Sequence, residues 1–373
     1  MKISFSTIPS INNCMGLRTN RQHKVYNENK CGTDFAAMLI PAAAYNSVMF
    51  RAQANSTMLL SQTDRLRCAY SRKPMISPYK LRTIFAKLGK KNTAQSAINF
   101  LKGYRDYMLD VETKVFDVFE EYGASGQINF QDILMEKRPE ALTNLKNKQK
   151  EILNSTNDYI LTFDENLAEE IFYLRDVALL KVEDGSFSRH GLLNQLKDFE
   201  VPRKYKNEIH EIYKKWYNLP RSYTDYDAFV VKYSKFSHEE IAQRLLNMSA
   251  ATVEHIESYS KGGEDKLKNL ALTCRLYNQD KGDMNLSEYE ECNPDIGIKQ
   301  NLIKYVNDVV REINNGNAFF IKNNSYPEDF IAQVVKNTGW KIKTKKVVLK
   351  QTAQQPKLTS SRKGANRYRN YRR

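Results

Sequence analysis

The residues between 252 and 284 combine a carboxylate, an imidazole and two carboxamides around a Gly-Gly loop. Glu254 and His255 are adjacent and precede the loop, Asn269 follows it, and Asn278 comes shortly afterwards. Carboxylate and carboxamide oxygens can hold one hard cation, and the imidazole can accept a proton beside it. This set of groups is what metal-assisted hydrolysis of a phosphodiester requires.

Two short apolar runs and a polar segment must position these groups. The first run leads into the Gly-Gly loop, and the second follows the loop. A polar segment follows that can form a helix. The apolar residues are Thr252, Val253 and Ile256 before the loop and Leu267, Leu270 and Leu272 after it.

The stretch resembles the HNH endonuclease motif, which runs as Asp-His-Ile, a loop with Ser and Gly-Gly, Asn-Leu, Cys, and Asn or His before Lys-Gly. The family folds it into a hairpin and a helix, the ββα-metal unit. The resemblance implies that His255 is the general base for the attacking water and that Asn269 braces the loop carrying it. It also implies that Glu254 and Asn278 hold one divalent ion, Mg²⁺ or Mn²⁺.

Three positions depart from the pattern. Glu254 replaces the usual Asp and reaches one methylene further, Ser258 replaces a common proline, and Asn278 replaces the second histidine, as it does in some active members. The alternative is a catalytically decayed ββα unit that binds nucleic acid without cutting it. The filled positions of His255, Asn269 and Asn278 favour an intact nuclease.

Many HNH proteins also carry two zinc knuckles, each with two cysteines separated by two residues, the first followed by Gly-Lys-Pro or a similar sequence. Here Cys68 is present but its partner position is Ser71, and Cys274 is present but its partner position is Tyr277. Structural zinc needs four ligands, usually thiolates or imidazoles. We therefore expect no structural zinc. The resemblance still implies that Cys68 and Cys274 lie close together.

The remaining patterns predict an α+β fold, in which a predominantly helical chain carries the small ββα-metal unit between disordered termini. Apolar residues at three-and-four spacing predict helices on both sides of the motif, and Ser237 with Glu240 predicts a capping box. Pro139 is expected in the first turn of its helix. The expected segments are a disordered 1–60, a degenerate knuckle at 61–76, a helical insertion at 77–248, the HNH unit at 249–290, packing helices at 291–340 and a basic tail at 341–373.

The net charge of +15 is concentrated at the C-terminus. Residues 341–373 contain twelve lysines and arginines and no acid. Arginines interleaved with tyrosines suit phosphates and bases of a nucleic acid, so Arg367, Arg369 and Arg372 are candidate contacts. Lys281 and Lys261, beside the motif, are further candidates.

Five scattered cysteines are too few for a disulfide framework, and no apolar stretch is long enough to span a membrane. We therefore expect a cytoplasmic protein without a membrane partner. Two functions follow. The first is a metal-dependent HNH endonuclease acting on nucleic acid, with DNA the expected substrate. The second is a decayed HNH scaffold that binds nucleic acid through its basic tail.

Overall fold

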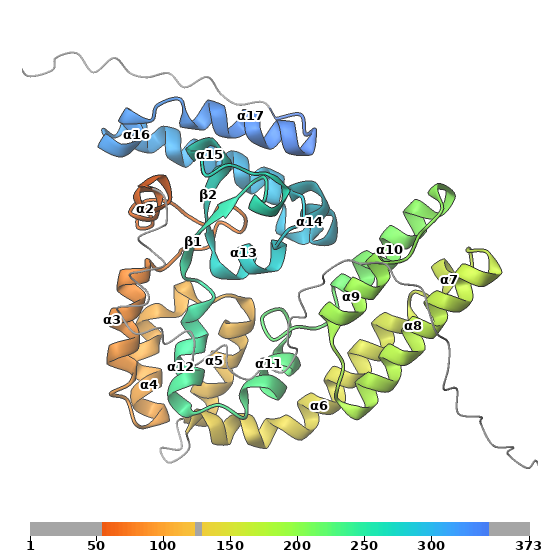
Figure 1. Cartoon of the computed structure of the whole chain (residues 1–373). Coiled ribbons are helices and arrows are strands. Elements are labelled where there is room, and N and C mark those ends of the chain that lie inside the picture. The colour runs from red at the N-terminus through yellow and green to blue at the C-terminus, as the bar shows by residue number, and fades with distance from the viewer. Residues whose placement is uncertain (1–53, 124–128, 343–373) are drawn as a thin grey trace, which may run out of the picture. The chain divides into compact units, whose positions relative to one another are not determined.

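The computed structural model describes residues 54–123 and 129–342, which all fall in one compact unit. Their order along the chain is a long helical region, a β-hairpin, and a second helical region (Figure 1). The predicted class, a predominantly helical α+β fold, is confirmed. The predicted tail lies outside the described residues, apart from Lys341 and Ile342. In the two described ranges no helix combines the length and apolar content needed to cross a membrane.

The first helical region precedes the hairpin. It opens with α2 (Ala54–Leu60), so the end of the segment expected to be disordered is helical. The elements that follow are α3 Pro78–Leu88, α4 Ala94–Leu101, η3 Lys102–Tyr107, α5 Asp110–Gly123, α6 Phe130–Asn154, α7 Asn157–Ile160, α8 Glu165–Asp184, α9 Arg189–Lys197, η4 Arg203–Tyr205, α10 Lys206–Tyr217, α11 Tyr226–Tyr233 and α12 His238–Asn247, where η denotes a 3₁₀ helix.

Side-chain caps fix where several of these helices begin. The predicted capping box at the start of α12 is present: the Ser237 hydroxyl accepts from the Glu240 amide, and the Glu240 carboxylate accepts from the Ser237 amide. Asn129 and Asp132 make the same reciprocal pair at the start of α6. Because this box starts α6 so early, Pro139 lies inside the helix, and its expected place in a first turn is wrong. A proline there removes one backbone donor from the helix.

The described residues contain one two-stranded sheet, the antiparallel hairpin of β1 (Ala251–His255) and β2 (Leu270–Cys274). Its register pairs Ala251 with Cys274 at one end and His255 with Leu270 at the other. The intervening loop includes η5 (Tyr259–Lys261) and η6 (Leu267–Asn269). Helix α13 (Arg275–Lys281) follows β2 directly and lies against the hairpin (Figure 1).

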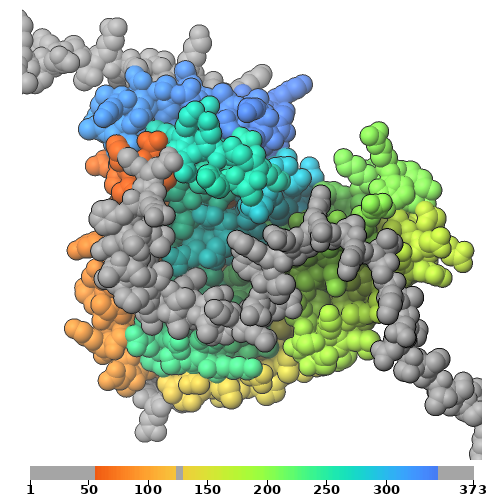
Figure 2. Space-filling model, in the orientation of Figure 1, coloured from red at the N-terminus to blue at the C-terminus, as the bar shows by residue number. Residues whose placement is uncertain are grey.

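The second helical region comprises α14 Leu286–Cys292, η7 Pro294–Ile296, α15 Ile298–Asn314, α16 Ala318–Lys322 and α17 Tyr326–Thr338. Its buried tyrosines hold the hairpin backbone: the Tyr326 hydroxyl donates to the Leu270 carbonyl at 2.8 Å, and the Leu272 amide donates to the Tyr305 hydroxyl at 3.3 Å. In the space-filling view the atoms of the region after residue 250 lie next to one another (Figure 2). The two strands alone would bury too little apolar surface to be stable.

The segment from Leu66 to Ile76, which we call the strap, runs beside the hairpin although it is far away in sequence. The Ala69 amide donates to the Leu272 carbonyl at 2.8 Å, and Ile76 forms an isolated parallel bridge with Ala250. The strap therefore belongs to the same structural unit as the hairpin.

Candidate active site

His255, the last residue of β1, carries its imidazole at the edge of the loop. Its Nε2 atom lies 2.5 Å from Oδ1 of Asp265, and the two side chains are 25% and 26% exposed. A carboxylate accepts a hydrogen bond, so the pair holds the proton on Nε2 and leaves Nδ1 as the basic nitrogen of the neutral ring. In the described part of the chain Nδ1 has no hydrogen-bond partner. The imidazole is thus oriented and can accept a proton.

Asn269 closes the loop that carries this pair. Its Oδ1 accepts from the Glu257 amide at 2.9 Å, and its Nδ2 donates to the carbonyls of Glu257 and Glu264 at 3.0 Å each. Asn269 is 1% exposed, so these bonds are shielded from water. The carboxamide thereby joins the residues just after His255 to the residue just before Asp265.

Gly263 allows the backbone on the two sides of this loop to come close together. A Cβ atom at this position would lie 1.9 Å from the carbonyl oxygen of Glu257, a contact that no side chain permits. The preceding Gly262 has φ +90, in the left-handed region that favours glycine. The Gly-Gly pair therefore allows the two sides of the loop to approach closely.

Glu254 and Lys281 form a buried ion pair beneath this loop. The Lys281 Nζ atom lies 2.8 Å from Glu254 Oε1 and 3.1 Å from the His255 carbonyl oxygen. The two side chains are 5% and 0% exposed. Burial raises the pKa of Glu254 to about 7, although the neighbouring ammonium acts in the opposite direction. Lys281, expected at a nucleic-acid phosphate, is inaccessible to one in this arrangement, and we withdraw that assignment.

Asn278 lies one helical turn before Lys281 on α13 and faces the same strand. Its Nδ2 atom donates to the Val253 carbonyl at 3.0 Å. Asn278 and Lys281 therefore both hold the backbone of β1, next to Glu254 and His255. The Asn278 Oδ1 atom is not used in this contact.

The oxygen donors of Glu254 and Asn278 suit a hard divalent ion by their chemistry. Their arrangement does not, because the only carboxylate of the pair is buried and already neutralised by the Lys281 ammonium. In addition, no group of three or more His, Cys, Asp and Glu side chains in the described residues is placed to hold a metal ion. As they lie, these residues do not fit the ion that the resemblance implies.

The four degenerate knuckle positions lie together at the other end of the hairpin. The Cys274 amide donates to the Cys68 sulfur at 3.2 Å, and both cysteines are fully buried. The Ser71 side chain acts to lower the pKa of Cys68, Cys274 and Tyr277, which places it beside all three. Burial alone raises the pKa of Cys68, but hydrogen bonds from Cys274 and Ser71 lower it to about 6. Two sulfurs and two hydroxyls are a poor ligand set for structural zinc.

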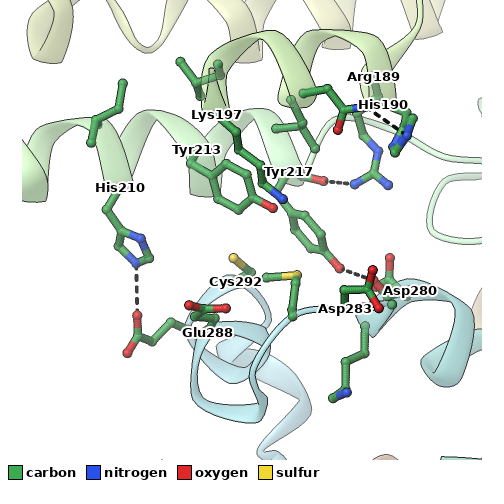
Figure 3. Close-up of a pocket in the computed structure, with 18 of the residues that line it drawn as sticks. Arg189, His190, Lys197, His210, Tyr213, Tyr217, Asp280, Asp283, Glu288 and Cys292 are labelled. Atoms are coloured by element: carbon green, nitrogen blue, oxygen red, sulfur yellow. Dashed lines mark hydrogen bonds and ion pairs between the residues drawn. The ribbon is translucent and has the colours of Figure 1, made fainter. Parts of the chain in front are cut away.

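The helical insertion holds α13 through Asp280. This side chain accepts from Arg221 and from the hydroxyls of Tyr223 and Tyr289, the latter two at 3.2 Å. The Tyr217 hydroxyl donates to the Asp280 main-chain carbonyl at 2.9 Å (Figure 3). Asp280 stands between Asn278 and Lys281, so these contacts fix the helix that packs on the candidate site.

A pocket of about 1050 Å³ opens beside this junction, between α9 and α10 on one side and α13 and α14 on the other (Figure 3). Arg189, Lys197 and His210 line the insertion side, whereas Asp283 and Glu288 line the opposite side. Charges of opposite sign therefore face each other across it, which does not favour a polyanion.

The other predicted nucleic-acid contacts are placed as follows. Lys261 is 43% exposed, and its Nζ atom donates to Asn285 at 3.0 Å. Arg367, Arg369 and Arg372 lie outside the described residues.

Asp265 was not predicted as a site residue. Its signal was an acid close behind the glycine pair, in a loop that must fold back on His255.

Comparison with protein families agrees with this geometry. The family model described as HNH endonuclease matches residues 238–284, from the first residue of α12 to just beyond α13. This stretch, with its hairpin, loop and helix, is an HNH endonuclease domain, and the match covers no other part of the chain. Neither a curated protein nor a solved structure shows significant similarity to the chain.

Proposed function

We propose that this protein is an endonuclease that hydrolyses phosphodiester bonds in nucleic acid, with DNA the expected substrate. The observation that carries the proposal is the His255–Asp265 pair, because an oriented and accessible imidazole is the group that a hydrolytic nuclease needs. The HNH match across the same residues supports it.

In the proposed reaction Nδ1 of His255 takes a proton from a water molecule, and the water oxygen attacks phosphorus. The bond from phosphorus to the leaving oxygen then breaks, and the resemblance implies a product with a 5′-phosphate. Asp265 keeps the imidazole in the required tautomer and stabilises the imidazolium that forms. Asn269 holds both residues at the correct separation.

HNH nucleases typically use a divalent ion, and Mg²⁺ or Mn²⁺ is the ion proposed for this enzyme. Because Glu254 is buried against Lys281, no residue is assigned as a ligand of that ion. We assign target choice to the helical insertion and the basic tail. We place the protein in the cytoplasm, which the free thiols of Cys68, Cys274 and Cys292 support.

One observation favours a second function, a nucleic-acid-binding scaffold without catalysis. An ammonium in contact with the expected carboxylate ligand is what a site that has lost its metal would contain. In this case His255 and Asp265 would be a structural pair.

The two functions differ in what happens to a bound oligonucleotide. A labelled duplex is incubated with the wild-type protein and with His255→Ala, with Mg²⁺ or Mn²⁺ present, and the ends of any fragments are identified. The proposed enzyme yields fragments carrying 5′-phosphates, and the variant binds equally well without cutting. Equal binding by both proteins with no fragments from either supports the scaffold.

A further inference from the structure

A second pocket, of about 260 Å³, lies on the strap and α15 and contains four arginines. Arg65, Arg67 and Arg72 come from the strap and the residue before it, and Arg311 comes from α15. The acidic side chains in its lining are Asp64 and Asp308. The pocket is distinct from the catalytic pair, because its strap passes the Cys274 end of the hairpin, roughly 13 Å along β1 from His255.

Arg72 has an unusual backbone conformation. Its φ of 63° lies in the left-handed region, and it is the only residue other than glycine with a positive φ in the described residues. It also stands where the zinc-knuckle pattern has glycine, just after the second cysteine position. A side chain at this φ strains the backbone, and such strain is common at functional sites.

The Arg72 guanidinium is incompletely paired. One nitrogen contacts Asp308, but Nη1 is buried without a hydrogen-bond partner among the described residues. Asp308 is shared with Arg311, whose Nη1 lies 2.9 Å from it. A buried guanidinium nitrogen without an acceptor is costly. The Arg72 side chain is 17% exposed, so a small rotation would bring this nitrogen to an anion in the pocket.

The other arginines leave a positive excess in the pocket. Arg65 is paired with Glu312 at 3.3 Å, whereas Arg67 is exposed and its only hydrogen bond in the described residues is to the Arg72 carbonyl, at 3.4 Å. Planar guanidinium groups match the oxygens of a phosphate in pairs.

We propose that this arginine pocket binds a phosphate of the nucleic-acid backbone, away from the bond that is cut. The proposal rests on the proposed function, which supplies the nucleic acid. Because the strap is hydrogen-bonded to β2, a phosphate held there fixes the strand relative to His255. The pocket is thus an anchoring site, and Arg67 and Arg72 are its principal contacts.

Arg72→Gly is an informative test because glycine relieves the backbone strain while it removes the guanidinium. Asp308 keeps Arg311 as its partner in this variant. Arg67→Ala tests the second contact, and Lys322→Ala is the control, an exposed lysine on α16 that does not line the pocket. All are made with His255→Ala, so that binding is measured without cutting.

Binding of a fluorescent 20-mer duplex is followed by anisotropy over a range of salt concentrations. We expect Arg67→Ala and Arg72→Gly each to weaken binding and to reduce the slope of log affinity against log salt by about 0.9, the value for one lost phosphate contact. We expect Lys322→Ala to leave the slope unchanged and Arg72→Gly to melt no lower than its parent.

Unchanged binding and slope in both pocket variants, with the duplex bound by the parent, would overturn the anchoring site and leave the nuclease proposal intact. If inorganic phosphate binds to the pocket but the duplex does not contact it, the assignment of the pocket to nucleic acid is overturned. Cleavage by the otherwise wild-type protein is measured separately, so a failure of the nuclease proposal is recognised by itself.

Discussion

The Nε2 atom of His255 lies 2.5 Å from Oδ1 of Asp265, ten residues further along the chain. The contact joins the end of β1 to the far side of the loop and makes the imidazole a directed proton acceptor. The proposed catalysis depends on this pair.

Replacing Asp265 with Asn keeps the shape of the side chain but removes the charge that stabilises the imidazolium. We expect the cleavage rate constant to fall roughly 10- to 100-fold with little change in KM, since Asp265 acts through His255. Steady-state cleavage of an oligonucleotide measures both constants. The control is Asp283→Asn, a nearby exposed acid that accepts from Ser260. A rate equal to that of the wild type would show that Asp265 does not position the base.

The buried pair of Glu254 and Lys281 leads to a test by stability. Lys281→Met leaves a carboxylate buried without a partner, and we expect the free energy of unfolding to fall by about 3–5 kcal/mol. Adding Glu254→Gln to this variant should recover much of the loss, because the double variant contains no unpaired buried charge. Urea unfolding of the two single variants and the double variant measures the coupling.

The matched control for this cycle is the pair of Lys266 and Glu264, whose side chains are 64% and 56% exposed. Its removal should change stability little, because exposed pairs are screened by solvent. Additive losses at Glu254 and Lys281 would contradict the pairing. Mn²⁺ added to Lys281→Met tests whether Glu254 can instead be a metal ligand. If it can, the variant should be stabilised by the ion, because Glu254 is no longer paired.

His238 at the start of α12 predicts a pH dependence of stability. Its Nδ1 atom accepts from the Phe130 amide at 3.1 Å. Burial lowers the pKa of the ring, and this effect is larger than the opposite effects of the Lys91 carbonyl and the Glu239 carboxylate. A lowered pKa in the folded state means that the neutral ring is favoured. Its stabilising contribution is therefore present above the ordinary pKa of 6.5 and is lost as the pH falls below it.

The corresponding measurement is the melting temperature between pH 8 and pH 5. We expect the wild type to lose more stability on acidification than His238→Gln, whose side chain can still accept from Phe130 but does not titrate there. Parallel curves for the two proteins would show that His238 does not contribute to acid sensitivity.

The sequence predicted the parts of this fold that local patterns determine. The loop, the helix after Cys274 and the capping box at Ser237 follow from short-range periodicity and turn residues, and the hairpin follows from the resemblance to the HNH motif. The resemblance also anticipated that Cys68 and Cys274 lie together. These features need no knowledge of distant packing.

The features that the sequence did not predict depend on the tertiary packing of the helices, the hairpin and the loop. Asp265 becomes a partner of His255 only when Asn269 and Gly263 close the loop. Lys281 points inward because it shares a helix face with Asn278, three residues earlier, and that face packs on β1. The spacing was visible in the sequence, but the direction of the face was not.

The nuclease proposal depends above all on His255. It is tested by a plasmid-nicking assay with Mg²⁺, Mn²⁺ or EDTA that compares the wild type with His255→Ala. We expect nicked and linear plasmid from the wild type with a divalent ion, a loss of cutting in EDTA, and no cutting by the variant under any condition. Cutting by His255→Ala at the wild-type rate, or a plasmid that both proteins bind and neither cuts, would contradict it.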